Sequence, residues 1–187
     1  RWDLDEVAPN HPVVLSHQGL HACVLNSMAL SLAGITRETP EPPGSIIERD
    51  LATGEPNGVL FEMLGYIRGQ VMPPFSGEEL SKGAAIANRH CLSSGITSLQ
   101  DATYRNDYGR WQILRHFKEK GILRSRVYMM IGNQARVKFQ EAGMATGAGD
   151  SDLRLGGVKI MLSGSTGKLQ PTQSELNRQV LESHKAG

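Results

Sequence analysis

A lysine inside a short apolar run has the clearest potential for chemistry in this sequence. Lys159 interrupts residues 158–162, a run flanked by glycines that is typical of a buried strand in a parallel sheet. Desolvation disfavours an unpaired ammonium in such a run. One interpretation is structural: Lys159 lies at a strand end and its aliphatic stem reaches solvent. The other is chemical: the side chain acts as a base, as a Schiff-base amine or, once carbamylated, as a metal ligand.

The loop that follows this run, Ser-Gly-Ser-Thr-Gly at 163–167, would then line a site at the carboxyl end of the strand. Its last residues resemble the end of a phosphate-binding P-loop. That motif requires glycine where Leu162 stands and serine or threonine where Leu169 stands. The sequence therefore excludes a P-loop, although glycine-rich backbone after a strand can still form a small anion-binding nest.

Composition excludes several function classes. The 187 residues carry a formal net charge of +1, and aromatic residues make up only 5%. No basic tract is long enough for nucleic acid or an anionic membrane. No apolar run approaches 18 residues and no start resembles a signal peptide, which predicts a cytoplasmic protein. Cys23 and Cys91 form no metal-binding pair, and we expect both to be reduced core residues.

The two ends of the chain favour an internal piece of a longer protein. The sequence begins with Arg1-Trp2-Asp3 and not with an initiating methionine. It stops at 184–187, at the end of a predicted helix, where the next strand would follow.

Residues 1–75 are rich in proline, glycine and turn signals, and do not follow a repeating βα pattern. The pattern predicts a strand at 13–15 and a helix over 21–33 that ends at Gly34. Residues 45–50 and 59–62 flank a turn and predict a β-hairpin.

Residues 76–187 alternate between helices and strands. Capping boxes at Ser76/Glu79 and Thr172/Glu175 open the first and last helices, the last running to Gly187. Further helices are predicted at 108–121 and 135–142, and strands at 96–99, 127–131 and 158–162. This order predicts a parallel sheet with right-handed crossovers. In such folds sites collect at the carboxyl ends of strands, here residues 100–101, 132–133 and 163–167.

A set of short motifs carries a family resemblance. Residues 8–13 (Ala-Pro-Asn-His-Pro-Val), 26–30 (Asn-Ser-Met-Ala-Leu) and 33–35 (Ala-Gly-Ile) resemble the insert of the amidohydrolase-3 group. This group belongs to the metal-dependent amidohydrolase superfamily and includes members similar to N-substituted formamide deformylase. Motifs within 43–62 and at 95–102 continue the resemblance, which covers nearly the whole chain.

The resemblance implies an α/β fold that is part of a (β/α)8 TIM barrel. Residues 1–75 would be an insert or cap segment after barrel strand 1, and residues 76–187 would supply about strands 2–4 with their helices. Lys159 matches the strand-4 lysine that is carboxylated in related enzymes and bridges two divalent metals. Carboxylation converts the cation into an oxygen ligand suited to Zn²⁺ or a similar ion.

Two further residues are candidates for substrate binding. By the resemblance, His21 matches a pocket-facing histidine of the insert; the alternative is a structural partner beside a helix start. Asp101 ends a predicted strand, where function and helix N-capping are the two alternatives. The sequence also departs from the family: Ser163 stands where Asp is frequent, and the strand-1 His-x-His pair is absent. No catalytic residue is therefore identifiable within the chain.

The function implied is hydrolysis of amide or other C–N bonds in a small molecule by metal-activated water. The alternatives are a non-catalytic or regulatory relative and a different α/β enzyme with Lys159 as a Schiff-base amine. The divalent metal, zinc by this reading, belongs to the full-length parent, and we expect the 187 residues alone to be metal-free and inactive. Three barrel strands leave open edges, so either an oligomer or the remainder of the chain should cover them.

Overall fold

The computed structural model describes residues 1–164, 167 and 170–185, which form a mixed α/β fold. The chain divides into two units. The first comprises Arg1–Pro74 and Leu162–Gln170; the second comprises Phe75–Met161 and Pro171–Gly187. The segment that begins three residues after Lys159, at Leu162, is thus part of the first unit, and the last helix is part of the second.

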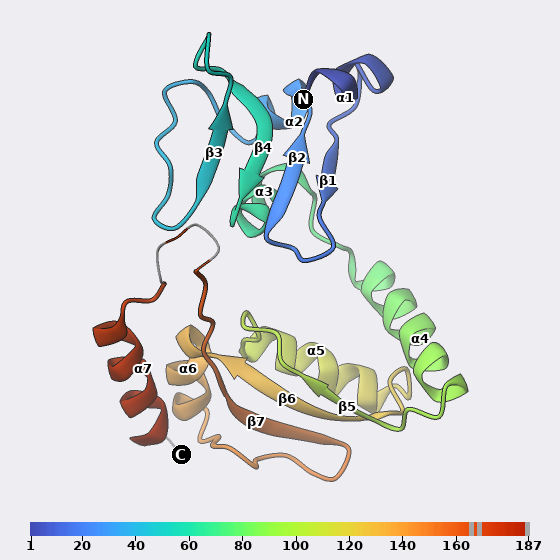
Figure 1. Cartoon of the computed structure of the whole chain (residues 1–187). Coiled ribbons are helices and arrows are strands. Elements are labelled where there is room, and N and C mark those ends of the chain that lie inside the picture. Colours follow the sequence, from blue (N-terminus) through green and yellow to red (C-terminus); the bar gives the residue numbers. More distant parts are fainter. Residues whose placement is uncertain (165–166, 168–169, 186–187) are drawn as a thin grey trace. The chain divides into compact units, whose positions relative to one another are not determined.

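The first unit is built on an antiparallel sheet in the order β1-β2-β4-β3 (Figure 1). The strands are β1 (Val14–Ser16), β2 (Ala22–Leu25), β3 (Ile46–Arg49) and β4 (Pro56–Phe61). The predicted hairpin is confirmed, since β3 pairs with β4. Helices α1 (Trp2–Val7), α2 (Ser27–Leu32) and α3 (Leu64–Val71) belong to the same unit. Leu25, Ile47, Leu60 and Ile67 are among the buried residues of its core.

The helix predicted over residues 21–33 is wrong in its first half. Residues 22–25 are strand β2, in which Cys23 and Leu25 are buried and alternate with half-buried neighbours. Cys23 pairs with Leu60 of β4, so this segment is an interior strand of the sheet. Over so few residues, a run of adjacent apolar side chains fits both the helical and the strand periodicity. The pairing of this segment with β4 decides that it forms a strand.

Asn26 lies between strand β2 and helix α2. It is the N-cap of α2, and its Oδ1 accepts hydrogen bonds from the backbone N–H groups of Ala29 (3.0 Å) and Val13 (2.9 Å). Its Nδ2 donates to the carbonyl oxygens of His11 (2.8 Å) and Ala8 (3.3 Å). The side chain is 1% exposed. One buried amide therefore satisfies four backbone groups from three segments.

We expect Asn26→Ala to lower the free energy of unfolding of the first unit by about 2–4 kcal/mol. The change removes a helix cap, worth about 1 kcal/mol, and leaves buried backbone donors and acceptors without partners, at about 1–3 kcal/mol each. Urea denaturation followed by circular dichroism measures the loss. Asn10→Ala, at an exposed turn, is the matched control and should change stability by less than about 0.5 kcal/mol. Equal effects of the two substitutions would contradict this account of Asn26.

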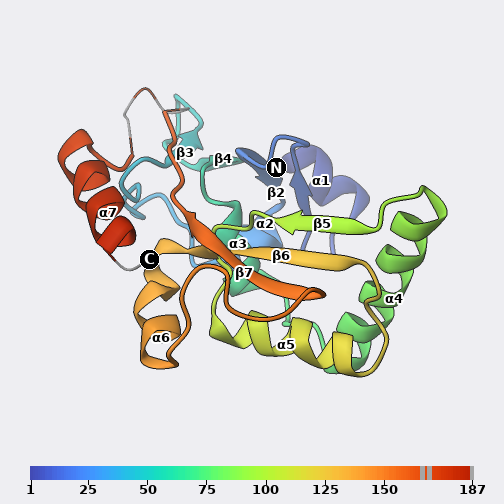
Figure 2. The same ribbon diagram turned by 90° about the horizontal axis from the view of Figure 1, so that it is seen from below.

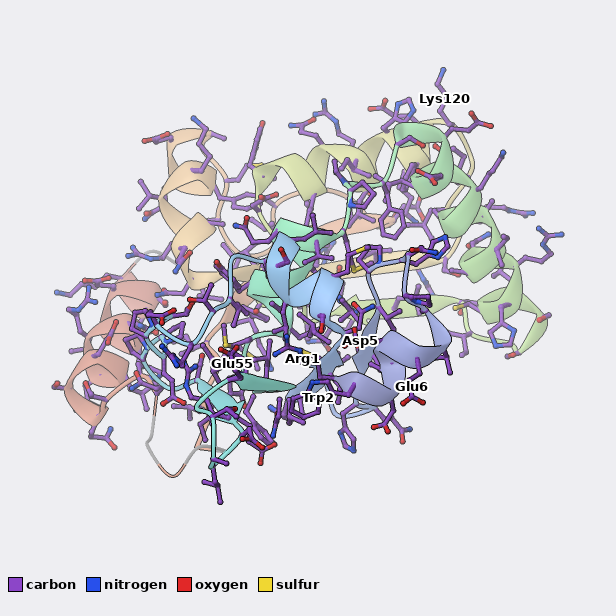
Figure 3. All side chains as sticks on the ribbon, turned by 90° about the horizontal axis from the view of Figure 1, so that it is seen from above. Arg1, Trp2, Asp5, Glu6, Glu55 and Lys120 are labelled. Atoms are coloured by element: carbon purple, nitrogen blue, oxygen red, sulfur yellow. The ribbon has the colours of Figure 1, made fainter. Side chains whose placement is uncertain are left out.

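The first residue ties α1 to the sheet. The guanidinium of Arg1 donates from Nη1 to the carbonyl oxygen of Pro56 (2.8 Å) and from Nε to the hydroxyl of Ser27 (2.8 Å). Glu55 lies 3.9 Å from Nη1 (Figure 3). Asp5 of α1 accepts from the backbone N–H and the hydroxyl of Ser27. These hydrogen bonds hold the pKa of the Asp5 carboxyl below its ordinary value.

The second unit contains the predicted parallel sheet, in the order β5-β6-β7. Its elements alternate along the chain: α4 (Gly77–Ser93), β5 (Ser98–Asp101), α5 (Tyr108–Glu119), β6 (Arg126–Gly132), η1 (Asn133–Ala135), α6 (Arg136–Glu141), β7 (Leu153–Lys159) and α7 (Gln173–Lys185). The capping box at Ser76 and Glu79 is present. Thr172 Oγ1 accepts from the N–H of Glu175 at 3.5 Å. The helix α7 runs to Lys185, and the predicted end at Gly187 lies outside the described residues.

One face of this sheet carries the core of the second unit. Val127, Met129 and Ile131 of β6 pack with Leu153 and Leu155 of β7. Helices α5 and α6 lie along the sheet (Figure 2) and contribute Trp111 and Phe139, whose rings meet edge to face at a centroid distance of 6.4 Å. Cys91 in α4 is half-buried, whereas Cys23 is buried in the first unit; both are free thiols.

The strand predicted at 158–162 is misplaced. The observed strand β7 begins at Leu153 and ends at Lys159, so residues 160–162 lie beyond it. The true strand alternates buried Leu153 and Leu155 with exposed Arg154 and then contains two glycines, which weaken its apolar signal. Strand β5 begins two residues later than predicted, at Ser98, and ends at Asp101, as expected.

Candidate functional site

Lys159 is the last residue of β7, at the carboxyl end of the parallel sheet. It is half-buried and pairs with Gly132, the last residue of β6. The structural interpretation of Lys159 predicted that it lies at the end of a strand, and the structure confirms this. That end is also the edge where sites form in parallel α/β folds, so the position is compatible with a chemical role.

A register shift decides which face Lys159 occupies. Met129 pairs with Leu155 and Ile131 pairs with Val158, so two steps along β6 match three steps along β7. Strict alternation from Leu153 and Leu155 would place Lys159 on the core face. The extra residue, within Gly156-Gly157, returns Val158 to the core and puts Lys159 on the opposite face. The lysine therefore lies on the same face as Tyr128 and Met130, away from the apolar core.

A cavity of about 580 Å³ lies at the carboxyl end of the parallel sheet. The segments after all three strands contribute to its lining, together with one residue of α7: Tyr104, Asn106, Gly132, Lys159, Met161 and Gln179 are among them. Small-molecule sites typically enclose roughly 300–1,000 Å³. The cavity is therefore of suitable size for a small substrate beside the lysine amine.

Asn106 and Gly132 fix the shape of this cavity. Asn106 is 1% exposed and donates from Nδ2 to the carbonyl oxygen of Met130 (2.9 Å), while its own carbonyl accepts from the N–H of Gly132 (2.9 Å). A Cβ at Gly132 would lie 2.1 Å from the carbonyl oxygen of Tyr104. The loop after β5 can therefore approach β6 this closely only because residue 132 is glycine.

Asp101 does not cap a helix. Its carboxylate accepts from the backbone N–H of Thr103 (2.9 Å), and the N-cap of α5 is Asp107, which accepts from the N–H of Arg110 (2.9 Å). Asp101 pairs with Met129 of β6, three residues before Gly132. It therefore lies about 10 Å further back along the strand direction than Lys159. Its visible role is to shape the start of the loop that lines the cavity.

His21 lies in the first unit, immediately before β2, and also caps no helix. Its Nδ1 is 2.8 Å from Oε1 of Glu62, which follows β4. The same Oε1 accepts from the hydroxyl of Ser163 at 3.1 Å. The structure thus joins His21 and Ser163 through Glu62, within the first unit. Asp101 and Lys159 belong to the second unit.

Beyond Lys159, Ser163 and Gln170 form an isolated antiparallel bridge. Ser163 and Gln170 exchange two backbone hydrogen bonds of 2.8 Å each. Residues 165–166 and 168–169 of the predicted anion nest lie outside the described residues. Ser163 occupies the position where the family motif frequently has Asp, and here its hydroxyl contacts a carboxylate.

Within the described ranges, no group of three or more His, Cys, Asp or Glu side chains is arranged to hold a metal ion. Lys159 fits a metal site in one respect. It lies at the carboxyl end of the parallel sheet, on the face opposite the apolar core, and it lines the cavity. As a carbamate it would offer oxygen donors, which suit divalent ions. A catalytic zinc site normally has about three protein ligands, of which Lys159 as a carbamate would be one.

Sequence reasoning missed Glu62 and Asn106. In the sequence, Glu62 is the last residue of the predicted hairpin and of the motifs within 43–62 that carry the family resemblance, and Asn106 lies between a predicted strand and a predicted helix. An asparagine between a strand and a helix signals a turn or cap, but its burial and its bond to the neighbouring strand follow only from the tertiary fold. Nothing local marks Glu62 as the partner of residues 41 and 101 positions away.

Comparisons with known proteins agree on one family. The family model described as "Amidohydrolase family" matches residues 1–179. "Putative amidohydrolase YtcJ" of Bacillus subtilis (strain 168) is 30% identical over 89% of this chain and 31% of its own length. "N-substituted formamide deformylase" of Arthrobacter pascens is 55% identical over 33% of this chain and 11% of its own. The chain thus spans less than a third of the length of these curated relatives.

Two solved structures share the fold. Both are described as uncharacterized metal-dependent hydrolases: that from Pyrococcus furiosus has a TM-score of 0.64 at 19% identity, and that from Pyrococcus horikoshii a TM-score of 0.62 at 18%. The matches cover 100% and 97% of this chain, and 41% and 38% of those chains. In the part of the chain that the structure describes, no helix is long and apolar enough to cross a membrane.

Proposed function

This chain belongs to the amidohydrolase family, and from that premise we propose that it is part of a metal-dependent hydrolase that cleaves amide or other C–N bonds of small molecules. The observation that carries the proposal is the placement of Lys159. A lysine that ends a parallel strand, turned off the core face by a register shift and bordering a cavity, is positioned for chemistry rather than for packing.

In this proposal the second unit is the part of a (β/α)8 barrel that holds strands 2–4, and residues 1–75 are the insert after strand 1. The parallel order β5-β6-β7 and the alternation of helices and strands support that placement. The open edges of β5 and β7 would then be covered by the remaining strands of the whole protein.

The chemistry of Lys159 begins with its neutral amine. Nζ attacks the carbon of CO₂, a new N–C bond forms, and the nitrogen releases one proton, which leaves an anionic carbamate. The carbamate oxygens would then hold a divalent metal, zinc in this proposal, together with ligands from the rest of the protein. The metal supplies Lewis-acid activation of water and of the substrate carbonyl when it is bound.

The other cavity residues would bind and orient the substrate. Asn106 and Gly132 hold the loop after β5 against β6 and so fix one wall. Asp101, through its bond to Thr103, sets the start of that loop. A direct role of Asp101 and His21 in substrate binding stays a prediction.

Metal removal tests the proposed function. We expect the whole protein to hydrolyse N-formyl or N-acyl amines, to lose this activity on dialysis against a chelator, and to regain it with a divalent ion. The isolated 187-residue chain, assayed in parallel by elemental analysis and turnover, should hold no tightly bound metal and show no turnover. Metal-independent hydrolysis by the whole protein would contradict the proposal. A tightly held metal with turnover in the isolated chain would instead show that the metal-ligand set lies within these 187 residues.

A further inference from the structure

Three chain segments meet at Glu62 in the first unit. Its Oε1 lies 2.8 Å from Nδ1 of His21 and accepts the hydroxyl of Ser163 at 3.1 Å. The backbone N–H of Glu62 donates to the carbonyl oxygen of His21 at 2.8 Å. Glu62 therefore holds His21 by both main chain and side chain.

The backbone at this cluster is in an unusual conformation. Glu62 has a φ of 56° and Leu20, next to His21, has a φ of 61°; these are the two non-glycine residues with positive φ in the part of the chain described. Such a conformation costs of order 1–3 kcal/mol and persists where surrounding structure imposes it. Glu62 directly follows Phe61, which pairs with Ala22 at the start of β2, and Leu20 lies two residues before Ala22.

The hydrogen bonds determine which imidazole nitrogen carries the proton. An ionised carboxylate has no proton to donate, so it can only accept from its partners, as Oε1 of Glu62 accepts from Ser163. When Glu62 is ionised, Nδ1 of His21 is therefore the donor in this pair. In neutral imidazole this leaves Nε2 as an acceptor. The His21 side chain is 58% exposed and that of Glu62 only 22%, so the ring is accessible to a ligand while its anchor is largely covered.

We propose that Glu62 is a positioning residue that fixes His21 in the Nδ1–H tautomer, so that Nε2 accepts a hydrogen bond from an N–H or O–H group of the substrate. The identity of that substrate as an amide-type small molecule rests on the proposed function. Ser163 connects the same carboxylate to the segment after Lys159.

The tautomer can be measured without any assay of activity. We would label the whole protein with ¹⁵N-histidine, assign His21 by loss of its signals in His21→Gln, and record ¹⁵N–¹H spectra at mildly alkaline pH. The expected result is a neutral Nδ1–H ring in the wild type. Glu62→Leu should shift His21 toward the Nε2–H tautomer, with Glu62→Gln intermediate because its amide oxygen still accepts. Glu48→Leu, on the exposed side of the same sheet, should leave His21 unchanged.

A second variant separates positioning from folding. Ser163→Ala removes one hydrogen bond to Oε1 but keeps the Glu62–His21 pair, so the His21 tautomer should stay Nδ1–H even if stability falls. A wild-type ring protonated on Nε2, or a tautomer indifferent to Glu62→Leu in a folded protein, overturns the proposal. If the tautomer responds as expected, KM for an N-formyl substrate should rise in Glu62→Leu more than kcat falls. A tautomer response without any metal-dependent hydrolysis would reject the proposed function and leave the Glu62–His21 assignment intact.

Discussion

Replacement of Lys159 by alanine is expected to lower hydrolysis by the whole protein about 10³-fold and to reduce its tightly bound metal. Loss of one metal ligand is expected to raise the activation free energy by about 4 kcal/mol. This increase corresponds to the stated factor, because each 1.36 kcal/mol changes the rate tenfold. Steady-state kinetics and elemental analysis on the same preparation measure both effects. The removal of a half-buried side chain from a strand end should change folding stability little by comparison.

The matched control is Lys138→Ala, on α6, whose amine pairs with Glu141 at 3.1 Å on the surface. It should retain metal and activity. Added acetate or propionate should partly restore Lys159→Ala, because a free carboxylate can take the place of the carbamate. Borohydride trapping of a carbonyl substrate on Lys159, with no dependence on metal, would instead favour a Schiff-base enzyme and contradict the hydrolase assignment.

Gly132→Ala is expected to destabilise the second unit by roughly 3 kcal/mol or more. The new Cβ would lie 2.1 Å from the carbonyl oxygen of Tyr104 and 3.5 Å from that of Asn106. The clash with these backbone atoms is relieved only if the loop after β5 moves. This movement would break the hydrogen bond between Asn106 and the carbonyl oxygen of Met130 in β6. Overpacking of this kind, together with a lost buried hydrogen bond, belongs to the severe class of substitutions. Urea denaturation measures the effect.

Gly157→Ala provides the comparison within the same sheet. Nothing lies within 4 Å of a Cβ at that position and its φ is not in the left-handed region, so we expect a change below about 1 kcal/mol. If Gly132→Ala were as mild as Gly157→Ala, the close approach of the β5 loop to β6 would not exist in solution.

The sequence predicted the second unit better than the first. Helices with clear caps and stops, such as α4 after Ser76 and α5 before Gly121, appear where expected. Their signals are local: a capping box, a spaced apolar face and a glycine that reaches positive φ. Strand β2 was mistaken for helix because its identity depends on pairing with β4, which no local pattern encodes.

The candidate site was predictable in type but not in geometry. Lys159 stood out because a charge interrupts an apolar run, yet the run itself was placed too late in the chain, since residues 160–162 look like strand and are not. The face that Lys159 occupies depends on one extra residue at Gly156-Gly157. A single-residue register shift reverses the side of a strand, and two adjacent glycines do not reveal it. The Glu62–His21 pair depends on contacts between segments distant in sequence.

The most direct test of the central claim is detection of a carbamate on Lys159. The metal-loaded whole protein, equilibrated with ¹³C-bicarbonate, should show a ¹³C carbamate resonance in the folded state. That resonance should disappear in Lys159→Ala, persist in Lys138→Ala and weaken when the metal is removed. An active, metal-loaded protein without this resonance, or with a resonance that survives Lys159→Ala, would show that Lys159 is not a carboxylated metal ligand.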